Sequence, residues 1–162
     1  MRLLIIRHAA AVPGGAPGID DDDRPLTPRG RARFERAARG LARIVDRPDV
    51  LLTSPLPRAR ATAKIAARAF GRIEPAVEPV LAHGTLAGIV AALARQPAGA
   101  TVAIVGHEPT LGALLARLVG SGVRFAFKKG GAALVDLPSG PRSAGRLVWF
   151  VKPRILRALA DD

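Results

Sequence analysis

Apolar residues follow two different spacings along this chain, and the two spacings predict two kinds of element. Short continuous apolar runs are typical of buried strands, whereas apolar residues that recur every three or four positions are typical of helices that bury one face. Buried strands are predicted at residues 2–7, 50–53 and 101–105. Helices are predicted at residues 27–46, from Ser54 to about Phe70, around residues 86–93, and from Pro109 through Leu118.

Hydroxyl side chains and prolines mark where two of these helices should begin. Thr27 precedes Pro28, and Ser54 precedes Pro55. A hydroxyl residue at the cap followed by proline in the first helical position is a frequent helix start. Each pair therefore predicts a helix that begins at its proline.

The remaining segments predict shorter elements and complete the fold class. An edge strand interrupted by Pro79 is predicted at 76–81, two paired strands at 132–137 and 146–151, and a short helix from Ile155. Strands that alternate with helices of ten or more residues favour a three-layer α/β/α sandwich with a mostly parallel central sheet. Because the chain shows no internal repeat or long linker, we expect residues 1–162 to form a single domain.

The composition excludes several kinds of site and location. The chain contains no cysteine, which removes disulfides, thiolate metal ligands and cysteine nucleophiles together. No apolar run is long enough to span a membrane, and the run at residues 3–6 is too short for the apolar part of a signal peptide. We therefore expect a cytoplasmic protein with no membrane partner.

The net charge of +12 at pH 7 raises the question of an anionic partner. Many of the cations lie in the predicted helix at 27–46, namely Arg29, Arg31, Arg33, Arg36, Arg39 and Arg43, with Arg47 just beyond it. They mostly occupy the positions between apolar residues of helical spacing, so a solvated helix face accounts for them. Aromatic residues do not alternate with them, as a base-stacking surface would require. We predict no nucleic-acid partner, although the charge would attract anionic substrates or phosphoproteins.

Four residues that suit an anion follow the ends of predicted strands. Arg7 and His8 end the first strand, His107 follows the strand at 101–105, and Arg58 lies in the first turn of the helix after the strand at 50–53. In parallel sheets the carboxyl ends of the strands meet at one edge, where ligands bind. Helix N-termini there add partial positive charge and free N–H groups. The sequence therefore predicts a site for a phosphate-like dianion with a nitrogen nucleophile at hand.

Each of these residues also has a purely structural interpretation. His8 would then be a hydrogen-bonded structural residue, Arg7 a strand end in solvent, Arg58 a surface cation, and His107 a helix cap. A zinc site formed by His8, His83 and His107 is a further alternative. We predict no metal, because the neighbouring arginines would repel the ion. The joint placement at three strand–helix junctions favours the anion site.

Four segments of the chain resemble a known family. They are Leu4-Ile5-Ile6-Arg7-His8, Leu26-Thr27-Pro28-Arg29-Gly30, residues 53–62 (Thr-Ser-Pro-Leu-Pro-Arg-Ala-Arg-Ala-Thr), and Val105-Gly106-His107-Glu108-Pro109. In this order they are similar to the signatures of the histidine phosphatase superfamily. Within it, the small size and the Arg24-Pro25-Leu26-Thr27 segment resemble the SixA-type phosphohistidine phosphatases.

The resemblance implies a phosphoglycerate mutase-like fold and a role for each residue. His8 would be the nucleophile that is transiently phosphorylated. Arg7 and Arg58 would bind phosphate oxygens, and His107 would do so while charged. This agrees with the chemistry of phosphoryl transfer, which needs a nucleophile in line and positive donors around the phosphoryl oxygens. A neutral imidazole must be the attacking form, so a neighbouring acceptor has to fix its tautomer. The sequence does not say which group that is.

Two positions depart from the family pattern. Ala9 follows the nucleophile where the family usually has glycine, and a left-handed backbone there would be strained. Many members carry a glutamate as general acid after the third strand, where this chain has Leu81-Ala82-His83-Gly84. His83 is then a possible proton donor, although it could equally be a loop residue. Glu78 and the run at residues 20–23 are rival acids.

These observations predict a phosphatase that acts through a phosphohistidine intermediate on His8 and needs no cofactor. The expected substrate is phosphohistidine on a signalling protein, since no long insertion is present to cover a small substrate. A phosphatase of a small phosphorylated metabolite is the alternative. A non-catalytic module that binds phosphate or nucleic acid is the second class of function. We expect a monomer or weak dimer.

Overall fold

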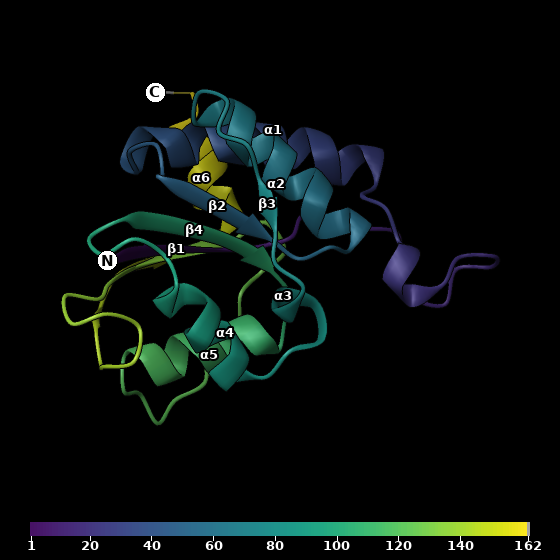
Figure 1. The fold of residues 1–162 in the computed structure, drawn as a ribbon. Helices are drawn as coiled ribbons and strands as arrows, with labels where there is room; N and C mark the ends of the chain where they lie inside the picture. Colours follow the sequence, from purple (N-terminus) through teal and green to yellow (C-terminus); the bar gives the residue numbers. More distant parts are fainter. Residues whose placement is uncertain (162) are drawn as a thin grey trace.

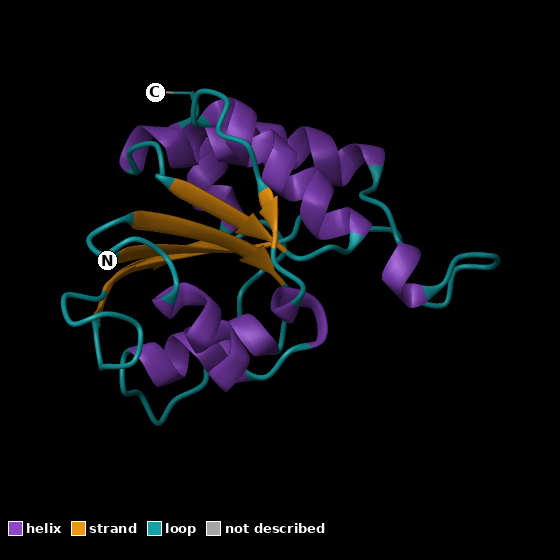
Figure 2. Cartoon of the chain, viewed as in Figure 1, coloured by secondary structure: helices purple, strands orange, loops and turns teal. Residues whose placement is uncertain are grey.

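A six-stranded sheet lies at the centre of the computed structural model, which describes residues 1–161 (Figures 1 and 2). Its order is β3-β2-β4-β1-β5-β6. The strands are β1 (Arg2–Arg7), β2 (Val50–Thr53), β3 (Ala76–Val77), β4 (Thr101–Gly106), β5 (Ala132–Asp136) and β6 (Arg146–Val151). The first four strands pair in parallel, whereas β5 is antiparallel to both β1 and β6. The predicted mostly parallel sheet and the predicted C-terminal strand pair are both confirmed.

Helices cover both faces of the sheet, which confirms the three-layer prediction (Figure 1). One face carries α1 (Pro28–Ile44), α2 (Pro57–Ala69) and α6 (Pro153–Leu159). The other carries α3 (Val80–His83), α4 (Leu86–Ala94) and α5 (Thr110–Leu118). A short 3₁₀ helix, η1 (Asp21–Asp23), lies in the long loop between β1 and α1. Among the described residues, no helix combines the length and apolar character needed to cross a membrane.

The strand β1 shows why its run of four apolar residues is buried on both sides. Leu4 and Ile6 pack in the cluster under α1, α2 and α6. Leu3 and Ile5 pack in the cluster under α4 and α5. Successive strand residues point to opposite faces, so a strand covered on both faces needs apolar residues at every position. This burial fixes the position of Arg7 and His8 at the end of β1.

Local signals placed one helix start correctly and another incorrectly. Thr27 caps α1 by accepting a hydrogen bond from the Gly30 amide at 2.9 Å, with Pro28 in the first turn. The prediction that Ser54 caps the next helix is wrong, because α2 begins at Pro57 with Leu56 in the cap position. Pro57 rather than Pro55 occupies the first helical position, and the Ser54 hydroxyl is used elsewhere in the site.

The predicted edge strand at 76–81 is only partly correct. It forms β3 at the sheet edge but ends at Val77. Pro79 has φ −57° and ψ −31° and leads into the single turn α3. Proline has no N–H for a sheet ladder, and its fixed φ suits the start of a helix. The segment therefore turns away from the sheet and carries His83 to the end of α3. The last helix begins at Pro153, two residues before the predicted Ile155.

Candidate active site

The parallel strands β1, β2 and β4 bring the predicted site residues to one edge of the sheet. Arg7 pairs with Gly106 at the ends of β1 and β4. Thr53 pairs with Val105 at the end of β2. The residues that follow, among them His8, Ser54 and His107, therefore lie next to one another, although 99 positions separate the two histidines. This is the meeting point that the sequence predicts.

His8 is held as a buried, neutral imidazole. Its side chain is 4% exposed, and its Nδ1 atom lies 2.7 Å from the carbonyl oxygen of Ala9. A carbonyl can only accept, so Nδ1 carries the proton and Nε2 keeps its lone pair. Burial lowers the pKa of His8 to about 3, although the hydrogen bond to Ala9 acts in the opposite direction. The Ala9 carbonyl is the tautomer-fixing acceptor that the sequence did not reveal.

The residue after His8 is not strained. Arg72 is the non-glycine residue with a positive φ among those described, so Ala9 does not adopt the left-handed backbone that the family pattern suggested. The Ala9 amide donates to Thr62 Oγ1 at 3.0 Å, and the same hydroxyl donates to the Arg58 carbonyl at 2.7 Å. Thr62 is fully buried. It thus ties the backbone beside His8 to the first turn of α2, a role that sequence reasoning missed.

Both predicted arginines are fixed by backbone carbonyls. Arg7 Nη1 donates to Phe127 O at 2.6 Å, and Arg58 Nη1 donates to Asp21 O at 2.9 Å. Arg58 is only 5% exposed, so it is not a surface cation. Burial lowers the pKa of each of the two guanidinium groups from its usual high range. Their charges are therefore held in a partly desolvated place, where they interact more strongly with an anion.

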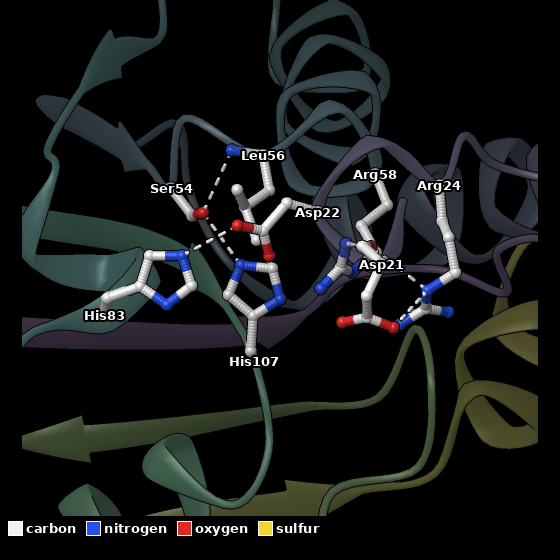
Figure 3. Close-up of polar contacts among 8 residues, drawn as sticks. All are labelled: Asp21, Asp22, Arg24, Ser54, Leu56, Arg58, His83 and His107. Atoms are coloured by element: carbon white, nitrogen blue, oxygen red, sulfur yellow. Dashed lines mark hydrogen bonds and ion pairs between the residues drawn. The ribbon is translucent and has the colours of Figure 1, made fainter. Parts of the chain in front are cut away.

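His107 lies against His8 and is positioned by a serine. The two ring centroids are 5.1 Å apart. Ser54 Oγ lies 2.7 Å from His107 Nε2 and accepts from the Leu56 amide at 3.2 Å (Figure 3). Burial lowers the pKa of His107 to about 4, with a further lowering from the charge of Arg58. His107 is therefore neutral at pH 7 in the free protein, and the expected positive charge would have to be acquired together with the phosphoryl group.

Three buried nitrogen atoms in this site have no protein partner. Across residues 1–161, the buried side-chain nitrogen and oxygen atoms without a hydrogen bond are Arg7 Nε, Arg58 Nε and His107 Nδ1. All three belong to the residues that the sequence predicts to contact phosphate. Leaving such a group without a partner costs roughly 1–3 kcal/mol. A tetrahedral oxyanion would provide acceptor atoms for them.

An acidic segment faces the site from the loop after β1. In η1, Asp21 Oδ1 accepts from Arg24 Nε at 2.9 Å, and Asp22 Oδ2 lies 3.2 Å from His83 Nε2 (Figure 3). This confirms that the acidic run lies near the site. His83 is exposed at the end of α3, and its charge acts on His107.

The other rival acid is engaged elsewhere. Glu78 Oε2 accepts from Arg95 Nη2 at 3.2 Å. The zinc alternative also finds no counterpart, since the described residues contain no cluster of three His, Cys, Asp or Glu side chains arranged to hold a metal ion.

Sequence reasoning also missed Glu108, which lies next to His107 in the chain. Glu108 Oε1 accepts from the Gly112 amide at 2.8 Å, and its charge acts on Arg7. Burial raises the pKa of this carboxyl, while the Gly112 hydrogen bond and the charge of Arg7 lower it. Glu108 therefore supports the Arg7 guanidinium from the side of α5.

Comparison with known proteins gives the family and the fold that this chain resembles. The sequence profile of the Histidine phosphatase superfamily (branch 1) matches residues 3–89. An uncharacterised protein of Picosynechococcus sp. is 40% identical over 115 residues, which is 69% of each chain. A crystal structure of a candidate phosphohistidine phosphatase SixA from Agrobacterium tumefaciens is 29% identical with a TM-score of 0.77, covering 94% of this chain and 97% of that one. A protein histidine phosphatase SixA complexed with tungstate is 27% identical with a TM-score of 0.82, covering 96% and 99% of the two chains.

Proposed function

The chain belongs to the histidine phosphatase superfamily, and from this premise we propose that it removes phosphoryl groups by way of a phosphohistidine formed on His8. The observation that carries the proposal is the geometry of the His8 imidazole. Its Nδ1 proton is held by Ala9 O at 2.7 Å, so Nε2 is free to attack. A pKa of about 3 keeps the ring neutral throughout the physiological range.

In the first step, His8 Nε2 forms a bond to phosphorus while the bond between phosphorus and the leaving group breaks. Negative charge on the phosphoryl oxygens is then stabilised by Arg7 and Arg58, with His107 as a third donor. Their three buried unpartnered nitrogen atoms support this role. Fixed donors of this kind need no reorganisation during the reaction. In the second step, water attacks phosphorus, the P–N bond to His8 breaks, and inorganic phosphate leaves.

We propose His83 as the group that transfers a proton to the leaving group. It lies at the rim beside His107, and the Asp22 carboxylate 3.2 Å away can orient its ring. The exposed position suits a donor that exchanges protons with solvent between turnovers. The P–N bond of a phosphohistidine is labile and needs less protonation than an alkyl phosphate. A histidine at the rim is therefore adequate for such a substrate.

Phosphohistidine on a signalling protein in the cytoplasm is the substrate that we favour. The likeness to two SixA structures supports it, one of which is named a protein histidine phosphatase and holds tungstate, a tetrahedral oxyanion. A small phosphorylated metabolite remains the second candidate, because the phosphate-binding residues themselves do not distinguish the two.

The experiment that tests the proposal traps the phosphorylated enzyme. The protein is incubated with para-nitrophenyl phosphate in EDTA, quenched, and the modified residue is located by mass spectrometry. Chelator-resistant turnover with phosphate on His8 supports the proposal, and His8→Ala should abolish both signals. Lack of turnover in the wild-type protein, or phosphate on another residue, would refute it. A phosphohistidine protein and phosphoserine, supplied in parallel, then separate the two substrate classes by kcat/KM.

A further inference from the structure

A second cavity, whose lining includes none of the predicted phosphate-binding residues, lies between α1, α6 and the loop before β5. Figure 1 shows α1 and α6 on the same face of the sheet. The cavity has a volume of about 350 Å³, which is within the range of small-molecule sites. Its lining includes six cationic residues and, within the described chain, no acidic one. The cations are Arg33, Lys128, Lys129, Lys152, Arg154 and Arg157.

These six charges come from three separate parts of the chain. Arg33 lies on α1, Lys128 and Lys129 in the loop before β5, and the other three on α6 or directly before it. None of the six forms an ion pair with a carboxylate of residues 1–161. Burial lowers the pKa of Arg157, and the positive charges of Arg33, Arg36 and Arg154 lower it further. The cavity therefore concentrates positive charge that no carboxylate of the described residues neutralises by an ion pair.

Gly130, which lines the cavity, lies close to the nucleophile. Gly130 has φ +78°, and a Cβ atom there would lie 3.3 Å from the Phe34 ring and 3.7 Å from Pro153. The Gly130 amide donates to the carbonyls of Arg7 and His8 at 3.2 and 3.1 Å. Ala9 also lines the cavity. The cavity and the active site thus meet at the backbone of His8 and Ala9.

We propose that this cavity is a binding site for a small soluble molecule that carries several phosphate groups, such as a nucleoside triphosphate. The proposed active site offers a single phosphoryl group two arginines and one histidine, whereas six cations from three directions match a chain of phosphates. The concave shape favours a small ligand over a flat membrane surface. The site is distinct from the one that holds the phosphoryl group on His8, and its occupancy does not depend on catalysis.

The test is calorimetric titration of ATP, and separately of inorganic triphosphate, into protein saturated with tungstate. Tungstate is intended to occupy the active site, so that the measured heat comes from binding in the second cavity. Binding with about one site per chain, weakened by added salt, is expected. The double variant Lys129→Glu/Arg154→Glu should bind at least about ten-fold more weakly, which corresponds to about 1.4 kcal/mol.

The control is Arg39→Glu/Arg68→Glu, which makes the same change of charge on the α1–α2 surface. It should bind like the wild type. The neutral variant Lys129→Gln/Arg154→Gln serves where charge reversal prevents folding, which a thermal unfolding curve reveals. Two results would overturn the proposal. One is equal affinity of the cavity and control variants. The other is binding only to vesicles of phosphatidylinositol bisphosphate and not to the soluble triphosphates. Because no turnover is measured, a failure of the proposed phosphatase activity would leave this test unaffected.

Discussion

Thr62 offers a sharp test of how the backbone beside the nucleophile is held. Its hydroxyl accepts from the Ala9 amide at 3.0 Å and donates to the Arg58 carbonyl at 2.7 Å. Replacing Thr62 with valine keeps the branched shape and removes the hydroxyl. The buried Ala9 amide then has no acceptor, and the link between β1 and α2 is broken. Both stability and catalysis should decrease.

The size of each effect follows from the contacts. An unsatisfied buried amide costs roughly 1–3 kcal/mol of unfolding free energy. For a chain of this length each kcal/mol lowers Tm by about 2–4 °C, so Tm should fall by roughly 2–12 °C. A shift of the backbone that carries His8, or of the Arg58 helix turn, misplaces reacting groups. We expect kcat for para-nitrophenyl phosphate to fall roughly 10- to 100-fold.

Urea unfolding and steady-state kinetics measure the two effects on the same preparations. Thr62→Ser is the matched control, because it keeps the hydroxyl and loses only a methyl group. The serine variant should retain most of the activity that valine loses. Equal kcat values for valine and wild type, at equal stability, would show that the hydroxyl positions neither His8 nor Arg58.

Three further changes test other parts of the structure. Arg58→Ala should lower kcat by roughly 100-fold or more, as the loss of one fixed oxyanion donor does, and near-normal kcat/KM would remove Arg58 from the site. Unfolding free energy should fall as the pH is lowered from about 6.5, because the pKa of His8 is about 3 in the folded protein and the unfolded chain binds the proton first. Between pH 7 and pH 5, His8 alone should lower the free energy of unfolding by about 2 kcal/mol. Urea unfolding of His8→Asn should therefore show a shallower pH dependence than that of the wild type. An unchanged slope would contradict this. Gly40→Ala should lower Tm strongly in thermal scans, because the added Cβ atom would collide with the Leu156 carbonyl. Gly122→Ala is the control, because a Cβ atom there meets open space and should leave Tm unchanged. Equal Tm values for the two variants would refute the collision.

The parts of the fold that the sequence predicted are those governed by local pattern. The apolar run of β1 and the Thr27-Pro28 helix start each depend on neighbouring residues, and both were correct. The helix start predicted at Ser54-Pro55 was wrong, because the Ser54 hydroxyl contacts His107, a residue 53 positions away. The α3 turn was missed because a proline in a short apolar run is compatible with either a strand edge or a helix start.

In the candidate site too, some features follow from local pattern and others depend on distant contacts. Strand-end placement was enough to bring Arg7, His8, Arg58 and His107 to one edge. The groups that orient them were not predictable, because Phe127 O, Asp21 O and Ala9 O are backbone atoms that every residue possesses. Thr62 lay within the matched segment at 53–62, but its contact with Ala9 depends on how α2 lies against β1. Such contacts emerge only from tertiary packing.

The position of β1 between β4 and β5 has a consequence for biosynthesis. Arg2 has Thr101 opposite it on one side and Asp136 on the other. The strand β1 must therefore wait until about a hundred further residues have been translated before either neighbour exists. Until then its four apolar side chains have no sheet to join, and a nascent chain at this stage is a natural client for a chaperone that shields exposed apolar segments.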